Sequence, residues 1–100
     1  MTSTRLHIRV AAELRDLVPR FLANRRLDVE QLRDAAAQRD FEQARRIGHV
    51  LKGAGGGYGF DEITRIGAEI ETLAKDSDER FAALVGELAD YLDRVDVTFE

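Results

Sequence analysis

Apolar residues recur along the first third of the chain with the period of a helix. They advance in steps of three, four and seven residues, which places them on one helical face: Ala11, Leu14, Val18, Leu22, Val29, Leu32 and Ala36. Pro19 falls inside this series, where a proline removes a backbone donor and clashes with the preceding turn. We therefore expect a short first helix ending near Val18 and a longer helix with Pro19 in its first turn.

Three more helices follow from the same pattern. Asp40 and Gln43 resemble a capping box, so a helix should begin there, with apolar positions Ala44, Ile47, Leu51, Ala54 and Tyr58. After Gly59, Asp61 is expected to cap the next helix, whose apolar face comprises Ile63, Ile66, Ile70 and Leu73. Residues 75–78 form a charged connection, and the last helix presents Phe81, Leu84, Leu88, Leu92 and Val95.

The connections between these helices are only a few residues long, which forces neighbouring helices to run antiparallel. The predicted fold is therefore all-α: an antiparallel up-down four-helix bundle with a short additional N-terminal helix. A chain of 100 residues fits a single domain, 1–100. The pattern leaves open whether residues 97–99 extend along the bundle or fray.

Composition excludes several classes of function. The chain has no cysteine, which excludes a disulfide framework, a thiolate metal site and a cysteine nucleophile. No stretch has the apolar character of a signal peptide or a membrane span, so a cytoplasmic location is the default expectation. A net charge of −4 gives no global attraction to nucleic acid or anionic membranes. We expect another protein as the partner.

The most informative candidate residue is His49. It lies on the predicted helix that begins near Asp40, the third one when the short N-terminal helix is counted as the first. On a helical wheel at about 100° per residue, it lies about 180° from the centre of that helix's apolar cluster. It should therefore face solvent, and the same half of the wheel holds Glu42, Arg45, Arg46, Lys52, Gly53 and Gly56.

The neighbours of His49 favour phosphoryl transfer. Lys52 lies one turn away, where its ammonium can offset charge carried on the imidazole. Gly53 and Gly56 continue the same line, and each mid-helix glycine costs about 1 kcal/mol relative to alanine. Because they leave the imidazole open, another protein's active site can approach it. A neutral imidazole is a good nucleophile near neutral pH.

Other sites fit the sequence less well. Lysine precedes the glycine run, so the run is not a phosphate-binding P-loop, and Phe60 stands where a dinucleotide fingerprint requires glycine. No metal site is expected, because His7 and His49 are the only histidines and lack metal-ligand spacing. Glu69 and Glu71 point in different directions along one helix, so we expect them at the surface or in inter-helix salt bridges.

The stretch from His49 to Phe60 resembles the signature of the histidine-containing phosphotransfer (HPt) domain, written H-x-L-K-G with a second glycine six residues later. Phe21-Leu22 and Asp40-Phe41 support the resemblance upstream, and Ile70-Glu71 supports it downstream. The resemblance covers about residues 14–92. Family members more often carry serine or alanine at some of Gly55, Gly56 and Gly57. We nevertheless expect a continuous helix as far as Tyr58, since Ala54 and Tyr58 keep the apolar phase.

The resemblance implies a monomeric phosphoryl carrier that relays phosphate between receiver-domain aspartates in two-component signalling. His49 would be phosphorylated and Lys52 would assist by charge. Gly53, Gly56, Arg45 and Arg46 would form the face that docks receivers. Partners would be response-regulator receiver domains and a hybrid sensor kinase. The domain would need no cofactor of its own, because Mg²⁺ would come with the receiver.

Two alternatives place His49 in a different context. A sensor kinase's dimerisation bundle also displays a phosphorylated histidine, but an acidic residue normally follows it, whereas Val50 follows His49. The chain is also too short for an ATP-binding domain, so autonomous kinase activity is not expected. The second alternative is a helical protein-interaction module that docks partners without phosphotransfer chemistry.

Overall fold

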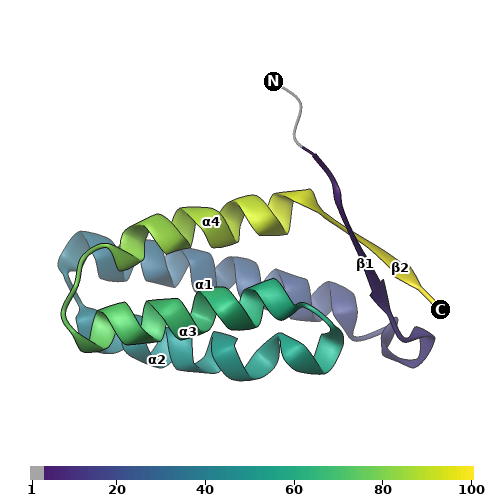
Figure 1. Cartoon of the computed structure of the whole chain (residues 1–100), viewed down its shortest axis with the longest axis horizontal. Helices are drawn as coiled ribbons and strands as arrows, with labels where there is room; N and C mark the ends of the chain where they lie inside the picture. Colours follow the sequence, from purple (N-terminus) through teal and green to yellow (C-terminus); the bar gives the residue numbers. More distant parts are fainter. Residues whose placement is uncertain (1–3) are drawn as a thin grey trace.

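The computed structural model describes residues 4–100, and most of them form four helices that lie alongside one another (Figure 1). These are α1 (Val18–Gln38), α2 (Phe41–Ala54), α3 (Asp61–Lys75) and α4 (Phe81–Arg94). Helices α1 and α3 each pack on both α2 and α4. The predicted helical class and its four substantial helices are confirmed.

The starts of α1 and α2 agree with the sequence signals. Pro19 lies in the first turn of α1, where its missing backbone donor is not needed. The Asp40 side chain accepts a hydrogen bond of 3.1 Å from the backbone N–H of Gln43 and caps α2. The start of α3 is different: Phe60 is the N-cap residue and makes no side-chain cap. Asp61, predicted to be the cap, is instead the first helical residue, where its charge favours the helix dipole.

The short additional N-terminal helix is not confirmed. That part of the chain contains strand β1 (Leu6–Val10) and η1 (Ala12–Leu14), a single 3-10 turn. Strand β1 pairs in parallel with β2 (Val95–Phe99), with Ile8 opposite Val97. This β-ribbon, residues 6–10 and 95–99, crosses one end of the bundle and pairs the N-terminal segment of the chain with its C-terminal segment (Figure 1). His7 lies on its exposed face.

The predicted continuous helix to Tyr58 is wrong. Helix α2 ends at Ala54, and η2 (Gly56–Tyr58) follows as a 3-10 turn. A Cβ at Gly55 would lie 2.5 Å from the backbone oxygen of Phe60, so only glycine allows the chain to fold back this closely. Gly59, at φ 87°, then turns the chain into α3. The glycines therefore build a compact corner between α2 and α3 and do not extend the helix.

No charged or polar residue is buried in the bundle interior among residues 4–100. Its largest fully buried side chains are Leu32, Leu51, Phe60, Ile63, Ile66, Ile70, Phe81 and Leu88. Phe21 of α1 stacks on Tyr58 and on Phe60, with ring centroids 4.3 Å and 5.4 Å away. These stacks hold the glycine-rich corner, residues 55–59, against α1. The segment that follows α2 therefore has a defined position although the helix ends at Ala54.

Candidate functional site

His49 lies on the outer face of α2, as its helical phase predicts. Its side chain is 68% exposed, whereas Ile47 and Leu51 on either side are buried in the core. Arg45 and Lys52 lie about one turn away on the same helix, and their spacing from His49 places them on its side of the helix. The structure therefore keeps the imidazole accessible to another molecule.

Glu71 of α3 holds the imidazole. Its Oε2 lies 2.8 Å from Nδ1 of His49, and its Oε1 accepts a hydrogen bond of 3.4 Å from Nζ of Lys52. Only 12% of the Glu71 side chain is exposed, so one carboxylate, largely covered, bridges the histidine and the lysine. The expectation of an inter-helix salt bridge at Glu71 is confirmed, but its partners are the two candidate site residues themselves.

Two glycines set the close approach of α2 and α3 that makes this contact. A Cβ at Gly48 would lie 2.7 Å from the backbone nitrogen of Glu71. A Cβ at Gly67 would lie 2.5 Å from the backbone nitrogen of Lys52. Real Cβ atoms do not come this close to backbone, so both positions require glycine. Their packing brings the Glu71 carboxylate within reach of His49.

The electrostatics of the site keep Glu71 ionised. The hydrogen bond with His49 and the nearby Lys52 ammonium hold the pKa of the Glu71 carboxyl below its ordinary value of 4.5. A carboxylate is only an acceptor, so the neutral imidazole must present Nδ1–H to it. The lone pair of the neutral ring then lies on Nε2, the nitrogen left without this partner.

The predicted docking residues differ in their surroundings. A Cβ at Gly53 would contact nothing within 4 Å, so this position is open. Gly56 is also exposed, but it belongs to η2, and the predicted helical line from His49 through Gly53 to Gly56 is wrong. Arg46 is exposed, and Arg45 forms hydrogen bonds of 3.1 Å and 2.6 Å with Glu42.

Sequence reasoning missed two features of this site. Gly48 and Gly67 were not singled out, although Gly67 precedes Glu71 by four residues and so shares its side of α3. Val50, noted only as the residue after His49, is an apolar side chain that is 54% exposed. A small residue directly before His49 and an apolar residue directly after it were the available signals.

Comparison with known proteins identifies the family. The family model described as Hpt domain matches residues 16–98. No curated protein and no solved structure gave a significant match. Within residues 4–100, none of the helices is long and apolar enough to cross a membrane. Hpt domains are phosphocarrier modules without autonomous enzyme activity, and they act in phosphorelays with receiver domains and kinases. Because the match spans most of its length, the chain belongs to the Hpt domain family, whose members carry out histidine phosphotransfer.

Proposed function

We propose that this chain relays a phosphoryl group between receiver-domain aspartates through a phosphohistidine at His49. The observation that carries the proposal is the Glu71 contact: it occupies Nδ1 and leaves Nε2 exposed on a surface open to a protein partner. A buried histidine could not meet a receiver, and a free surface histidine would not have a fixed tautomer.

The transfer step uses the lone pair of Nε2. It attacks the phosphorus of a receiver aspartyl phosphate, the N–P bond forms, and the P–O bond to the aspartate breaks to release its carboxylate. The Nδ1 proton stays on the ring, hydrogen-bonded to Glu71, whose negative charge stabilises the more positive phosphorylated ring. In the reverse step, a second receiver aspartate takes the group and the neutral imidazole is restored.

Lys52 supplies charge compensation. Its Nζ lies 3.4 Å from Glu71 and its side chain is 53% exposed, so the ammonium is anchored loosely at the edge of the site. Lysine is a flexible point charge, and rotation about its side-chain bonds lets it reach the transferred phosphoryl oxygens. Loss of Lys52 should slow transfer without abolishing it.

The docking face lies around the imidazole. Gly53 leaves open space, Val50 offers an exposed apolar contact, and Arg45 and Arg46 add positive charge. The receiver brings its aspartate and its Mg²⁺, so this chain needs no cofactor and no ATP. We place the chain, as a single monomeric domain, in the cytoplasm between response-regulator receivers and a hybrid sensor kinase.

The test is transfer from phosphorylated receivers. We expect the wild-type chain to acquire acid-labile, base-stable phosphate from at least one member of a receiver panel, and His49→Gln to acquire none while keeping its helical circular dichroism. An unlabelled wild type across the host's full receiver set would contradict the proposal. Stable receiver binding without any labelling would favour the alternative, a helical protein-interaction module.

The open space at Gly53 gives a second test. Gly53→Leu should remain folded, because a Cβ at this exposed position would meet nothing within 4 Å, but it should slow transfer by obstructing the receiver. Gly86→Leu is the matched control, since Gly86 lies in α4 with equally open surroundings. Equal transfer rates for Gly53→Leu, Gly86→Leu and wild type would contradict the access argument.

A further inference from the structure

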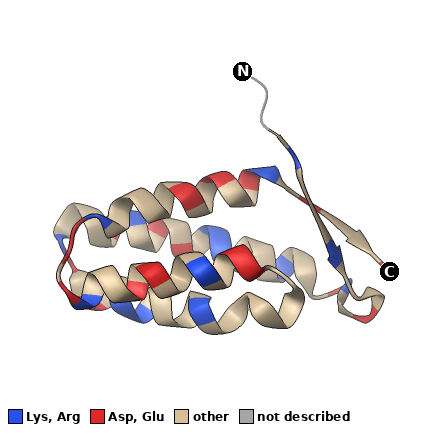
Figure 2. Ribbon diagram, viewed as in Figure 1, with Lys and Arg blue, Asp and Glu red and all other residues tan. Residues whose placement is uncertain are grey.

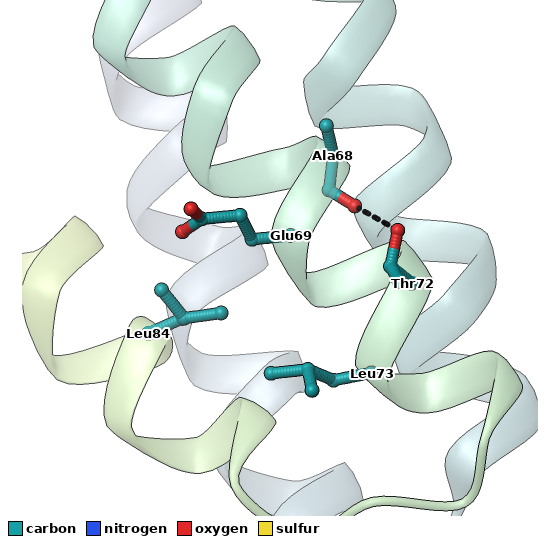
Figure 3. Close-up of a pocket in the computed structure, with 5 residues that line it drawn as sticks. All are labelled: Ala68, Glu69, Thr72, Leu73 and Leu84. Carbon is teal, nitrogen blue, oxygen red and sulfur yellow. Dashed lines mark hydrogen bonds between the residues drawn. The ribbon is translucent and has the colours of Figure 1, made fainter.

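A hollow of about 450 Å³ lies between α3 and α4, outside the His49 site. It is lined by Ala68, Glu69, Thr72, Leu73 and Leu84 (Figure 3). The side chains of Leu73 and Leu84 extend toward each other across it, and the Glu69 carboxylate lies above them (Figure 3). Both leucines are only half-buried, so the hollow has an apolar floor that solvent reaches.

The walls offer little hydrogen bonding to a small polar ligand. The Thr72 hydroxyl donates to the backbone oxygen of Ala68 at 3.0 Å, so its proton is already used within α3 (Figure 3). The remaining polar lining group is the Glu69 carboxylate. An apolar side chain is therefore the group that fits the hollow.

One end of the hollow carries excess negative charge. Arg65 is hydrogen-bonded to Glu62 at 2.9 Å, to Glu69 at 2.9 Å and also to Glu87. Three carboxylates around one guanidinium leave a formal charge of −2, and the Glu69 and Glu87 side chains are each about half exposed. Figure 2 shows the same bias, with several acidic bands on α3 and α4. We call this group, Glu62, Arg65, Glu69 and Glu87, the acidic cluster.

The hollow and the His49 site lie on different sides of α3. At about 100° per residue, Glu71 lies about 130° around the helix from the centre of the four α3 residues that line the hollow. A protein bound at the hollow therefore does not need to cover the imidazole, and the two surfaces can be occupied together.

We propose that this hollow binds an amphipathic helix of a second protein. An apolar side chain of that helix fills the space over Leu73 and Leu84, and its lysine or arginine residues pair with Glu69 and Glu87 of the acidic cluster. Charge decides this occupant over a second copy of the chain. A symmetric dimer would bring two acidic clusters together, with both copies carrying a net charge of −4.

The probe is a synthetic helical peptide of about 14 residues, with leucine on one face and lysine elsewhere. A matched peptide carries glutamate in place of lysine. Titration into the ¹⁵N-labelled full chain should shift the amide signals of the lining residues, 68, 69, 72, 73 and 84, and of Glu87. It should leave the signals of residues 48–53 unchanged, and the glutamate peptide should give no shifts. Shifts concentrated on another face, or no shifts, would overturn the proposal.

Variants separate the specific site from general attraction to an acidic protein. Glu69→Lys with Glu87→Lys should weaken peptide binding at least tenfold. Asp16→Lys with Asp34→Lys changes the net charge equally at exposed positions outside the hollow and should weaken it less than threefold. Thr72→Trp, which fills the hollow without changing charge, should also abolish binding, with folding checked by circular dichroism.

Two outcomes count against the proposal. Equal weakening in both double-lysine variants would show attraction to net charge alone. Sedimentation that reveals a dimer dispersed by Thr72→Trp would assign the hollow to a second copy. Phosphate transfer from a receiver serves as a separate readout, because the Thr72→Trp variant should keep it. Failure of the peptide test therefore leaves the proposed phosphotransfer untouched.

Discussion

After His49 itself, Glu71 is the residue on which the proposed phosphotransfer depends most directly. It contacts Nδ1 of the imidazole and Nζ of Lys52, and it reaches both from a different helix. Because it touches the ring and not the transferred group, it is a positioning residue. In the proposed transfer it fixes the tautomer and stabilises the ring once phosphate is attached.

Substitution of Glu71 should separate these two contributions. Glu71→Leu removes the acceptor and should slow phosphotransfer by roughly tenfold or more, the value of one charge-assisted hydrogen bond. Glu71→Gln keeps an acceptor for Nδ1–H and should recover part of the rate. The ¹⁵N shifts of the imidazole should show Nδ1–H in wild type and in Glu71→Gln, and a tautomer mixture in Glu71→Leu. Identical imidazole spectra in all three proteins would argue against a positioning role.

Tyr91 is a second residue with a measurable signature. It is 5% exposed, and its hydroxyl has no hydrogen-bond partner among residues 4–100. Burial, with smaller contributions from Glu62 and Asp61, raises the pKa of its phenol from 10.0 to about 12. Between these two values the unfolded chain loses the proton more readily than the folded chain, so the free energy of unfolding should fall as pH rises.

Tyr91→Phe should remove this dependence. Wild type should lose up to about 3 kcal/mol more stability than the variant between pH 10 and pH 12, since one pKa unit is about 1.36 kcal/mol. At pH 7 the variant should be at least as stable as wild type, because a buried hydroxyl without a partner costs about 1–3 kcal/mol. Urea unfolding at a series of pH values measures both effects. Parallel stability curves for the two proteins would show that Tyr91 does not titrate differently on folding.

At the level of single residues, the sequence predicted the exposed groups better than their partners. The phase of His49 follows from α2 alone, because one helix determines which of its faces is apolar. The pairing of His49 with Glu71 depends on how α2 and α3 align, and no local pattern encodes that alignment. Gly48 and Gly67 determine it, through contacts that exist only after the helices have packed.

At the level of secondary-structure elements, the junction of α2 with α3 has the tightest packing around the site. An alanine at Gly67 would put its Cβ 2.6 Å from Cβ of Leu51 and closer still to the α2 backbone. The helices would have to separate, and the contact between Glu71 and His49 would lengthen. Stability and phosphotransfer should therefore fall together.

The comparison of Gly67→Ala with Gly86→Ala tests this. Gly67→Ala should destabilise the chain by about 1–3 kcal/mol, as overpacking does, and should slow transfer. Gly86 lies on the exposed side of a helix interior, where a Cβ would meet nothing within 4 Å. Gly86→Ala should therefore raise the free energy of unfolding by up to about 1 kcal/mol and leave the transfer rate unchanged. Urea unfolding and receiver transfer assays measure both quantities. A neutral Gly67→Ala would mean that the two helices are free to adjust.

Helix starts and apolar faces could be predicted from the sequence, but the end of α2 could not. The apolar phase continues from Ala54 to Tyr58, which favours a continuous helix. The structure stops the helix because Gly55 packs against Phe60 and Thr64, a tertiary contact of the kind that overrides local periodicity. A helix that continues to Tyr58 and a helix that ends at Ala54 are both compatible with this glycine-rich sequence. Only the tertiary packing distinguishes them.

At the scale of the whole molecule, the β-ribbon is the feature that the sequence left open. Residues 97–99 were expected either to extend the bundle or to fray, and instead they pair with residues 8–10. Strand alternation is visible in Leu6, Ile8 and Val10, but a single short strand has no stability without a partner. That partner is about 90 residues away, so no local signal connects the two segments.

Removal of residues 96–100 should therefore uncouple the ribbon from the bundle. The four helices should keep their circular dichroism, and phosphotransfer should persist, because the hydrogen bond between His49 and Glu71 joins α2 to α3 and involves no residue of the ribbon. The free energy of unfolding should fall by about 2 kcal/mol, from lost burial of Val97 and Phe99. Urea unfolding measures this loss, and complete unfolding of the truncated chain would show that the bundle cannot fold without the ribbon.

The parallel pairing also determines how the molecule responds to tension. The start of β1 lies beside Val95, and the end of β2 lies beside Val10, so the chain enters β1 and leaves β2 at opposite ends of the ribbon (Figure 1). A force that pulls the termini apart slides β1 and β2 past each other along their length. All the ladder hydrogen bonds then share the load at once, whereas an antiparallel hairpin would open one bond at a time. Tension applied to the two ends of the chain would therefore load the ribbon in shear before it reached the helices.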